Sequence, residues 1–316
     1  MLTEESQPRI LVIRGGAIGD FVLTLPALYL LREAFPNAVL EILGYPHIAS
    51  LAENRFYANR VRSIEYGPLA GFFARNGTLD LALSDYFAGF QQIVSYLYDP
   101  DGIFETNVRK SGARNFLSAY RKPQNLHAAR EWARPLESLA LFLDDPAARL
   151  FLTSDDLASG RAWLGEGEGP RLALHPGSGS VSKNWASEHW GLLGLRFWER
   201  FPEGELVVLG GEADAEVLRF LGEAWRGKRV RFAINLPLPT IAALVASCGR
   251  FVGHDSGVSH IAAAVGVPCV LLFGPTDPAV WAPQNSGVRV VRAPLGDWQN
   301  LEISAVWSAV EALCEG

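Results

Sequence analysis

Short aliphatic runs alternate along the whole chain with longer segments whose apolar residues recur at helical spacing. Residues 10–13, Ile-Leu-Val-Ile, form a continuous β-branched and aliphatic run that is typical of a strand buried on both faces. A glycine-rich turn, a helical pattern over residues 21–35 and a second strand pattern over residues 38–43 follow. This order predicts a parallel sheet with right-handed crossovers. The expected fold class is therefore α/β.

The same alternation predicts further elements in both halves of the chain. Expected strands cover residues 61–64, 79–83, 92–98, 171–175, 205–209, 230–234, 249–253, 269–273 and 288–292. Expected helices cover residues 131–143, 185–201, 213–225, 240–247, 258–265 and 304–314.

The length of 316 residues predicts two domains at roughly 150 residues each. We expect a first α/β domain over residues 1–155 and a second over residues 170–300, each Rossmann-like. The stretch 144–169 is rich in Asp, Ala, Gly and Glu, as a linker would be. Residues 301–316 form the expected C-terminal helix.

Composition excludes several classes of protein. The net charge of −6, from 28 basic and 34 acidic side chains, argues against a general nucleic-acid binder. Three separated cysteines predict neither a disulfide scaffold nor a zinc site. The stretch 1–5 is acidic, unlike a signal peptide, and the longest charge-free apolar run, 261–275, is shorter than the ~20 residues of a membrane helix. The chain is therefore expected to be cytoplasmic.

Ligands of open parallel sheets bind beyond the carboxyl ends of the strands, and the distinctive residues of this chain stand there. The first such loop spans residues 15–20, where Gly16 lets the backbone approach a ligand. It does not match the dinucleotide pattern G-x-G-x-x-G. Asp20 near the helix start is either a capping carboxylate or a general base.

The second loop, His-Pro-Gly-Ser-Gly-Ser at 175–180, offers Ser178 and Gly179 to an anion. Lys183 follows closely, and it is one of only four lysines against 24 arginines. It is either a ligand of a phosphate oxygen or a solvated surface lysine.

Two more loops carry candidate ligands. Glu212, after the strand at 205–209, is either a ribose-binding carboxylate or a helix cap. The loop Gly-His-Asp-Ser-Gly-Val-Ser-His at 253–260 precedes an apolar helix and makes an anion cradle. His260 alone is more typical of a buried structural histidine. No metal-ligand spacing and no cofactor fingerprint stands in these loops.

Three groups of residues together resemble glycosyltransferase family 9, the bacterial ADP-heptose:lipopolysaccharide heptosyltransferases. The first is I-L-V-I-R-x-x-x-I-G-D at 10–20 with T-L-P-A-L at 24–28. The second is H-P-G-S-G-S at 175–180 with Lys183 and Trp185. The third, F-V-G-H-D-S-G-V-S-H-I-A-A-A at 251–264 with F-G-P-T-D-P at 273–278, is the most specific. Gly15, Gly16 and His254 depart from the residues common in the family.

The resemblance implies a GT-B fold, in which two Rossmann-like domains face a central cleft and the C-terminal helix packs back on the N-terminal domain. It implies inverting, metal-independent transfer without a cofactor, with Asp20 as base and Lys183 as the cation at the donor phosphates. The donor side would be formed by Ser178, Gly179, Lys183, Glu212 (or its rival Glu216), Asp255, Ser256, Gly257 and His260.

The expected partners are a nucleoside-diphosphate sugar such as ADP-heptose and an anionic lipopolysaccharide or other glycan acceptor. Residues 105–134 carry seven basic side chains against two acidic ones, which is either a solvated face or an acceptor site at the inner face of the cytoplasmic membrane. The predicted acceptor residues are Gly16, Arg114, Arg121 and Lys122. Alternatives are another GT-B sugar-nucleotide enzyme, such as an epimerase, and a non-catalytic sugar-nucleotide-binding protein.

Overall fold

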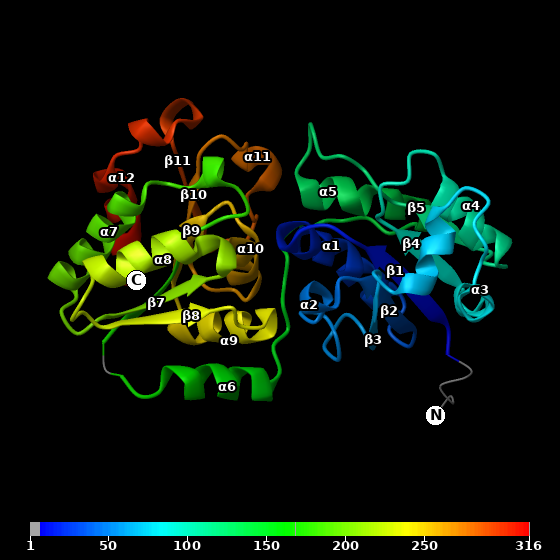
Figure 1. The fold of residues 1–316 in the computed structure, drawn as a ribbon, viewed down its shortest axis with the longest axis horizontal. Coiled ribbons are helices and arrows are strands. Elements are labelled where there is room, and N and C mark those ends of the chain that lie inside the picture. The colour runs from blue at the N-terminus through cyan, green and yellow to red at the C-terminus, as the bar shows by residue number, and fades with distance from the viewer. Residues whose placement is uncertain (1–6, 168, 316) are drawn as a thin grey trace. The chain divides into compact units, whose positions relative to one another are not determined.

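The computed structural model describes residues 7–167 and 169–315 (Figure 1). The acidic stretch 1–5 lies outside the described residues. The chain divides into two compact units. The first comprises the described residues up to Ala17 together with Thr24–Pro146, and the second comprises Ile18–Leu23 together with the described residues from Ala147 onward.

A five-stranded parallel sheet forms the centre of the first unit, in the order β3-β2-β1-β4-β5. Side chains alternate across a strand, so Leu11 and Ile13 of β1 pack in one core with α3 and α4, while Ile10 and Val12 are buried on the opposite face. The elements of this unit are β1 (Arg9–Arg14), α1 (Ile18–Ala34) from Thr24 onward, β2 (Val39–Gly44), α2 (Pro46–Ala49), β3 (Arg60–Ser63), α3 (Leu81–Ala88), β4 (Gln92–Ser95), α4 (Ile103–Lys110), β5 (Phe116–Ser118) and α5 (Ala128–Ala133).

The second unit contains a six-stranded parallel sheet in the order β11-β10-β9-β6-β7-β8. Helices cover both of its faces (Figure 1): α7, α8 and α12 pack on one, and α9 and α10 on the other. Its elements are α6 (Ser154–Leu164), β6 (Arg171–His175), α7 (Ser187–Arg200), β7 (Glu205–Gly210), α8 (Ala215–Ala224), β8 (Val230–Ile234), α9 (Leu238–Cys248), β9 (Phe251–His254), α10 (Gly257–Ala264), β10 (Cys269–Phe273), α11 (Pro278–Trp281), β11 (Val288–Arg292) and α12 (Ile303–Glu315).

Each sheet reverses its direction of growth once. In the first unit the chain builds outward from β1 to β2 and β3, then returns to place β4 on the other side of β1. In the second it builds from β6 to β7 and β8, then returns to place β9 beside β6. The two loops that leave such a pair of strands diverge, which opens a crevice at the carboxyl edge of the sheet.

The strand expected over residues 79–83 is wrong, because these residues begin helix α3. The Asp80 carboxylate accepts a hydrogen bond from the backbone N–H of Leu83 at 2.9 Å and caps the helix. Leu83 and Phe87, four residues apart, form its buried face, whereas Leu81 is 82% exposed. The alternation Leu-Asp-Leu-Ala-Leu resembles a strand pattern because the apolar residue Leu81 lies on the solvent-exposed side of the helix.

The helix expected over residues 131–143 is also shorter than predicted. Helix α5 ends at Ala133 and continues only as a 3₁₀ turn over Arg134–Leu139. Pro135 lacks the N–H that a continuing α-helix needs, and Ala140 adopts a φ of 58° that stops the turn. Helix α4 and strand β5, which were not predicted, lie just before this segment.

The expected linker belongs largely to the second unit. The boundary falls at Pro146 rather than at residue 155, and α6 packs against α9. A Cβ on Gly160 would lie 2.5 Å from the carbonyl oxygen of Ala243, so the glycine permits this close approach of the two helices.

The C-terminal helix, which the resemblance places against the first unit, packs on the sheet of the second unit. The buried face of α12, which includes Val306 and Val310, belongs to the same core as Trp190 of α7 and Val270 of β10. The backbone carbonyl of Leu313 also accepts a hydrogen bond from Arg250 Nε at 2.9 Å. The apolar stripe of α12 thus completes the second unit.

Within residues 7–167 and 169–315, every helix is too short or too polar to cross a membrane.

Candidate functional site

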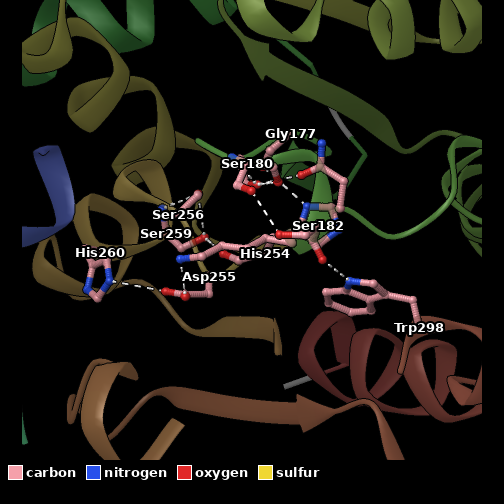
Figure 2. Close-up of polar contacts among 12 residues, drawn as sticks. Gly177, Ser180, Ser182, His254, Asp255, Ser256, Ser259, His260 and Trp298 are labelled. Carbon is pink, nitrogen blue, oxygen red and sulfur yellow. Dashed lines mark hydrogen bonds and ion pairs between the residues drawn. The ribbon is translucent and has the colours of Figure 1, made fainter. Parts of the chain in front are cut away.

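The loops after β6 and β9 lie side by side at the carboxyl edge of the second sheet (Figure 2). Strands β6 and β9 pair in parallel, with His175 opposite Gly253. The residues that follow each strand therefore emerge next to one another at the point where the strand order reverses. Most of the predicted donor residues belong to these two loops.

Lys183 and Asp255, which lie 72 residues apart in the chain, form an ion pair. Lys183 Nζ donates to Asp255 Oδ2 at 2.7 Å, with the carboxylate side chain 7% exposed and the lysine side chain 31% exposed. Burial alone would raise the pKa of Asp255, but the neighbouring His260 ring and the Lys183 ammonium lower it to about 2. The predicted phosphate ligand is thus held at the crevice by a carboxylate that stays ionised.

Helix α10 starts within this cluster. Ser256 is its N-cap, and its hydroxyl accepts a hydrogen bond from the backbone N–H of Ser259 at 3.4 Å. His260, in the first turn, places Nε2 3.8 Å from Asp255 Oδ1 and is 5% exposed. The structure therefore brings together Asp255, Ser256, Gly257 and His260 at one helix start, where the N–H groups and the helix dipole favour an anion.

Asp214, a buried carboxylate of the same edge, was not among the residues predicted from the sequence. Its Oδ2 accepts from the backbone N–H of Gly211 at 2.8 Å and lies 3.6 Å from Nε2 of His175. Burial opposes ionisation, but His175 and the Gly211 N–H outweigh it and lower the pKa of Asp214. His175 Nδ1 in turn lies 3.1 Å from Ser256 Oγ, so Asp214 and His175 connect the β7 edge to the start of α10.

The approach of Asp214 depends on a glycine. A Cβ on Gly177 would lie 1.7 Å from Asp214 Oδ1, so no other residue fits at 177 without displacing the carboxylate. The predicted Glu212 and Glu216 are both exposed on the turn and helix beside it. The signal that could have identified Asp214 is its place three residues after Gly211, where a carboxylate reaches back to the backbone.

Segment 177–185, which connects β6 to α7, carries Ser178, Gly179 and Lys183. Gly179 and Ser180 are exposed, and Ser178 Oγ lies 2.6 Å from Asn184 Oδ1 within the segment. The His254 ring lies beneath the segment and is fully buried. Its Nε2 accepts from the backbone N–H of Trp185 at 2.8 Å, and its Nδ1 lies 3.3 Å from the carbonyl oxygen of Gly177.

The turn after β1 and the start of α1 contain two predicted residues. Gly16 has a φ of 97°, a backbone conformation that favours glycine, and it is exposed. Asp20 is half-buried in the first turn of α1, where the helix dipole favours a carboxylate. Arg14, at the end of β1, is 5% exposed, and its guanidinium carbon lies 4.4 Å from the centroid of the Trp132 ring.

The structure separates the predicted acceptor arginines. Strand β5 runs from Phe116 to Ser118, so Arg114 precedes its amino end while Arg121 and Lys122 follow its carboxyl end. All strands of the sheet are parallel, and Arg121 and Lys122 therefore share an edge with Gly16 that Arg114 does not. Arg109, from the same basic stretch, pairs with Glu105 at 2.9 Å.

Comparison with known proteins places the chain in a family. Residues 106–307 match the family model of glycosyltransferase family 9 (heptosyltransferase). The chain belongs to glycosyltransferase family 9. The match covers the whole crevice of the second sheet and begins after the loop of Gly16 and Asp20.

Individual family 9 proteins are similar over different shares of their length. Lipopolysaccharide heptosyltransferase 2 of Salmonella typhimurium is 29% identical over 177 residues, which are 54% of this chain and 48% of that relative. The match thus spans about half the length of this curated relative. The crystal structure of a family 9 glycosyl transferase from Veillonella parvula has a TM-score of 0.80 at 17% identity and covers 99% of both chains. The Escherichia coli ADP-heptose lipopolysaccharide heptosyltransferase II has a TM-score of 0.74 at 18% identity, covering 97% of this chain and 98% of that one.

These structural likenesses confirm the α/β fold class with two parallel sheets, as in the GT-B-like heptosyltransferases. In this family 9 member, residues 7–167 and 169–315 contain no group of three or more His, Cys, Asp or Glu side chains that could hold a metal ion.

The buried His254 predicts a pH dependence of stability. Burial lowers the pKa of His254 to about 3 and outweighs the Gly177 carbonyl and the Asp214 and Asp255 carboxylates, which act in the opposite direction. In the unfolded state the His254 ring binds a proton near pH 6.5, whereas in the folded state it stays unprotonated at this pH. His254 therefore stabilises the fold fully above pH 6.5, and this contribution falls by about 1.4 kcal/mol per pH unit below it, or about 2 kcal/mol at pH 5.

This dependence is measured by urea unfolding of the wild type and of His254→Phe at pH 7.5 and pH 5. Eight of the nine tryptophans belong to the second unit, so tryptophan fluorescence reports mainly on its unfolding. The variant should lose less stability on acidification, because the other titrating groups are common to both proteins. Equal losses in the two proteins would contradict the assignment.

Proposed function

We propose that this chain is a heptosyltransferase that moves a heptose from ADP-heptose to an anionic lipopolysaccharide inner-core or similar glycan acceptor. The observation that carries the proposal is the crevice at β6 and β9, where Lys183, the start of α10 and the Ser178 segment converge in a family 9 chain. The supporting relatives are the heptosyltransferases of Salmonella typhimurium and Escherichia coli.

The donor diphosphate would bind to local groups rather than to a generally basic surface. Residues 151–316 carry thirteen basic and eighteen acidic side chains, so bulk charge repels an anion. Lys183, the N–H groups at Ser256 and Gly257, and Ser178 supply the attraction at short range. When ADP leaves, its growing negative charge is stabilised by the same groups. Glu212, exposed beside the crevice, is proposed to accept hydrogen bonds from the ribose hydroxyl groups of the donor.

The reaction proceeds as a single displacement in this account. The acceptor hydroxyl oxygen forms a bond to the anomeric carbon of heptose while the bond from that carbon to the ADP oxygen breaks. The hydroxyl proton passes to the Asp20 carboxylate, and the electron pair of the broken bond leaves on ADP. Attack opposite the leaving group inverts the anomeric configuration. The proposal assigns the neutralisation of ADP to Lys183 and the α10 dipole, without a metal ion.

The acceptor would bind the carboxyl edge of the first sheet that carries Gly16. Arg121 and Lys122 supply positive charge there, and both are exposed. Tyr98 and Tyr120 lie beside them, with ring centroids 5.2 Å apart and Tyr98 71% exposed. Exposed aromatic rings next to cations suit a phosphorylated sugar, because the rings cover apolar sugar faces and the cations bind phosphate. An acceptor of this kind would place the protein at the inner face of the cytoplasmic membrane.

Replacement of Asp20 by asparagine tests the catalytic base. Asp20→Asn should lower the turnover of ADP-heptose at least about a hundredfold, because the acceptor proton then has no base to receive it. The dissociation constant for ADP, measured by calorimetry, should stay within about twofold. The exposed carboxylate of α3 offers the matched control Asp85→Asn, which should leave both quantities unchanged. Turnover near the wild-type value in Asp20→Asn would refute the base assignment.

Charge reversal tests the acceptor edge. Arg121→Glu and Lys122→Glu should each raise the KM for a phosphorylated acceptor about tenfold and leave ADP affinity unchanged, since a cation–phosphate attraction becomes a repulsion. Arg114→Glu should have the smaller effect because it lies at the opposite edge. Arg75→Glu, at an exposed loop position, controls for the change in net charge. An Arg114→Glu effect as large as the other two would instead favour the whole basic stretch as the binding surface.

A further inference from the structure

Segment 177–185 needs a fixed base if it is to present its side chains to an anion. Its outer residues are exposed, and a Cβ on Gly179 would meet no atom within 4 Å. Its only regular structure is a 3₁₀ turn over Val181–Lys183. Backbone ordering costs about 1–2 kcal/mol per residue, so a short exposed segment of this kind holds one conformation only where other groups fix it.

The two ends of the segment meet on one side chain, the His254 ring. A backbone N–H can only donate, so the Trp185 N–H requires a lone pair on Nε2 at 2.8 Å. A backbone carbonyl can only accept, so the Gly177 oxygen requires the proton on Nδ1 at 3.3 Å. The ring must therefore be neutral, in the Nδ1–H tautomer, to bridge both ends at once.

The surroundings keep the ring neutral and fixed. His254 is fully buried, and burial lowers its pKa to about 3. The Trp190 ring meets it edge to face, with centroids 5.1 Å apart, and so does the Trp298 ring, with centroids 5.5 Å apart. A protonated ring would lose the lone pair that Trp185 uses, so the bridge persists at neutral pH because the cation is excluded.

Trp298 holds the middle of the same segment. Its Nε1 donates to the carbonyl oxygen of Ser182 at 2.9 Å (Figure 2). A Cβ on Gly274 would lie 2.4 Å from the Trp298 ring, so the glycine after β10 leaves the space that the indole occupies. Ser182 immediately precedes Lys183, and this bond therefore restrains the backbone that carries the lysine.

His254 also lies one residue before the partner of that lysine. Strand β9 ends at His254, and Asp255 follows with its carboxylate 2.7 Å from Lys183 Nζ. The end of β9 therefore fixes the segment twice: the His254 ring contacts both of its ends, and the Asp255 carboxylate binds Lys183.

We propose that His254 is a positioning residue that bridges the two ends of segment 177–185 and thereby sets Ser178 and Lys183 for the donor diphosphate. The inference rests on the proposed function for the identity of the ligand, while the bridge itself does not depend on it. His254 touches no substrate in this account and acts through the segment.

The test compares His254→Phe with a matched control. Phenylalanine keeps an aromatic ring between Trp190 and Trp298 and removes both hydrogen bonds. Trp190→Phe perturbs the packing of the same ring but leaves the bridge, because the Trp190 indole N–H has no hydrogen-bond partner among the described residues. Calorimetry with ADP, donor kinetics and hydrogen exchange at the Trp185 amide are measured on both full-length variants.

His254→Phe should weaken ADP binding at least about tenfold, raise the donor KM more than it lowers kcat, and speed exchange of the Trp185 amide. Trp190→Phe should lower the melting temperature while ADP affinity stays within about twofold. His254→Gln, whose side-chain amide has both an NH₂ donor group and a carbonyl acceptor, should fall between the wild type and His254→Phe. Wild-type ADP affinity in a folded His254→Phe protein would overturn the proposal.

Nitrogen NMR of the His254 ring in the wild type decides the bridge independently of any variant. At pH 7 the expected species is the neutral Nδ1–H tautomer, and an Nε2–H tautomer or a cation would overturn the proposal. A wild type that shows the Nδ1–H tautomer and a slow Trp185 amide yet binds no ADP would contradict the proposed donor and leave the bridge intact.

Discussion

The reversal of strand order between β6 and β9 is the constraint on which the rest of the second unit depends. Parallel strands deliver all their carboxyl ends to one edge, and neighbouring strands whose connections diverge leave room there. The strand pair brings Lys183 and Asp255 together although 72 residues separate them. The first sheet repeats the arrangement with β1 and β4, and the helix that follows β1, α1, carries Asp20 in its first turn.

At this edge of the second sheet, each buried carboxylate is kept ionised by the groups next to it. Asp255 is ionised because Lys183 and His260 face it, and Asp214 because His175 and a backbone N–H do. A donor diphosphate would therefore compete with Asp255 for Lys183 or share the lysine with it. A lysine restrained in this way loses little freedom on binding, which favours affinity through preorganisation. The neutral His254 ring adds fixed geometry beneath the same segment without adding charge.

Much of this could be predicted from local sequence, and the failures have physical causes. The strands β1, β6 and β9 are buried on both faces, so their apolar residues identified them and the loops after them. The start of α3 imitated a strand because Leu81 is apolar and exposed. Asp214 was not predicted because its position is set by contacts with His175 and Gly177, which are distant in the sequence. Glu212 and Glu216, the neighbouring carboxylates that were predicted, are exposed.

Other features lie beyond local patterns altogether. The pairing of Lys183 with Asp255 and the bridge from Gly177 to Trp185 through His254 depend on contacts between distant residues. The same holds for α12, whose apolar stripe indicates a buried face but not the sheet that buries it.

Product analysis tests the central claim most directly. The purified protein is incubated with ADP-heptose of known anomeric configuration and a heptose-deficient lipopolysaccharide core, and the products are examined by mass spectrometry and NMR. The account predicts free ADP and an acceptor heavier by one heptose whose anomeric configuration is inverted. A free epimerised sugar nucleotide, or binding of ADP-heptose with no heptose on the acceptor, would contradict it.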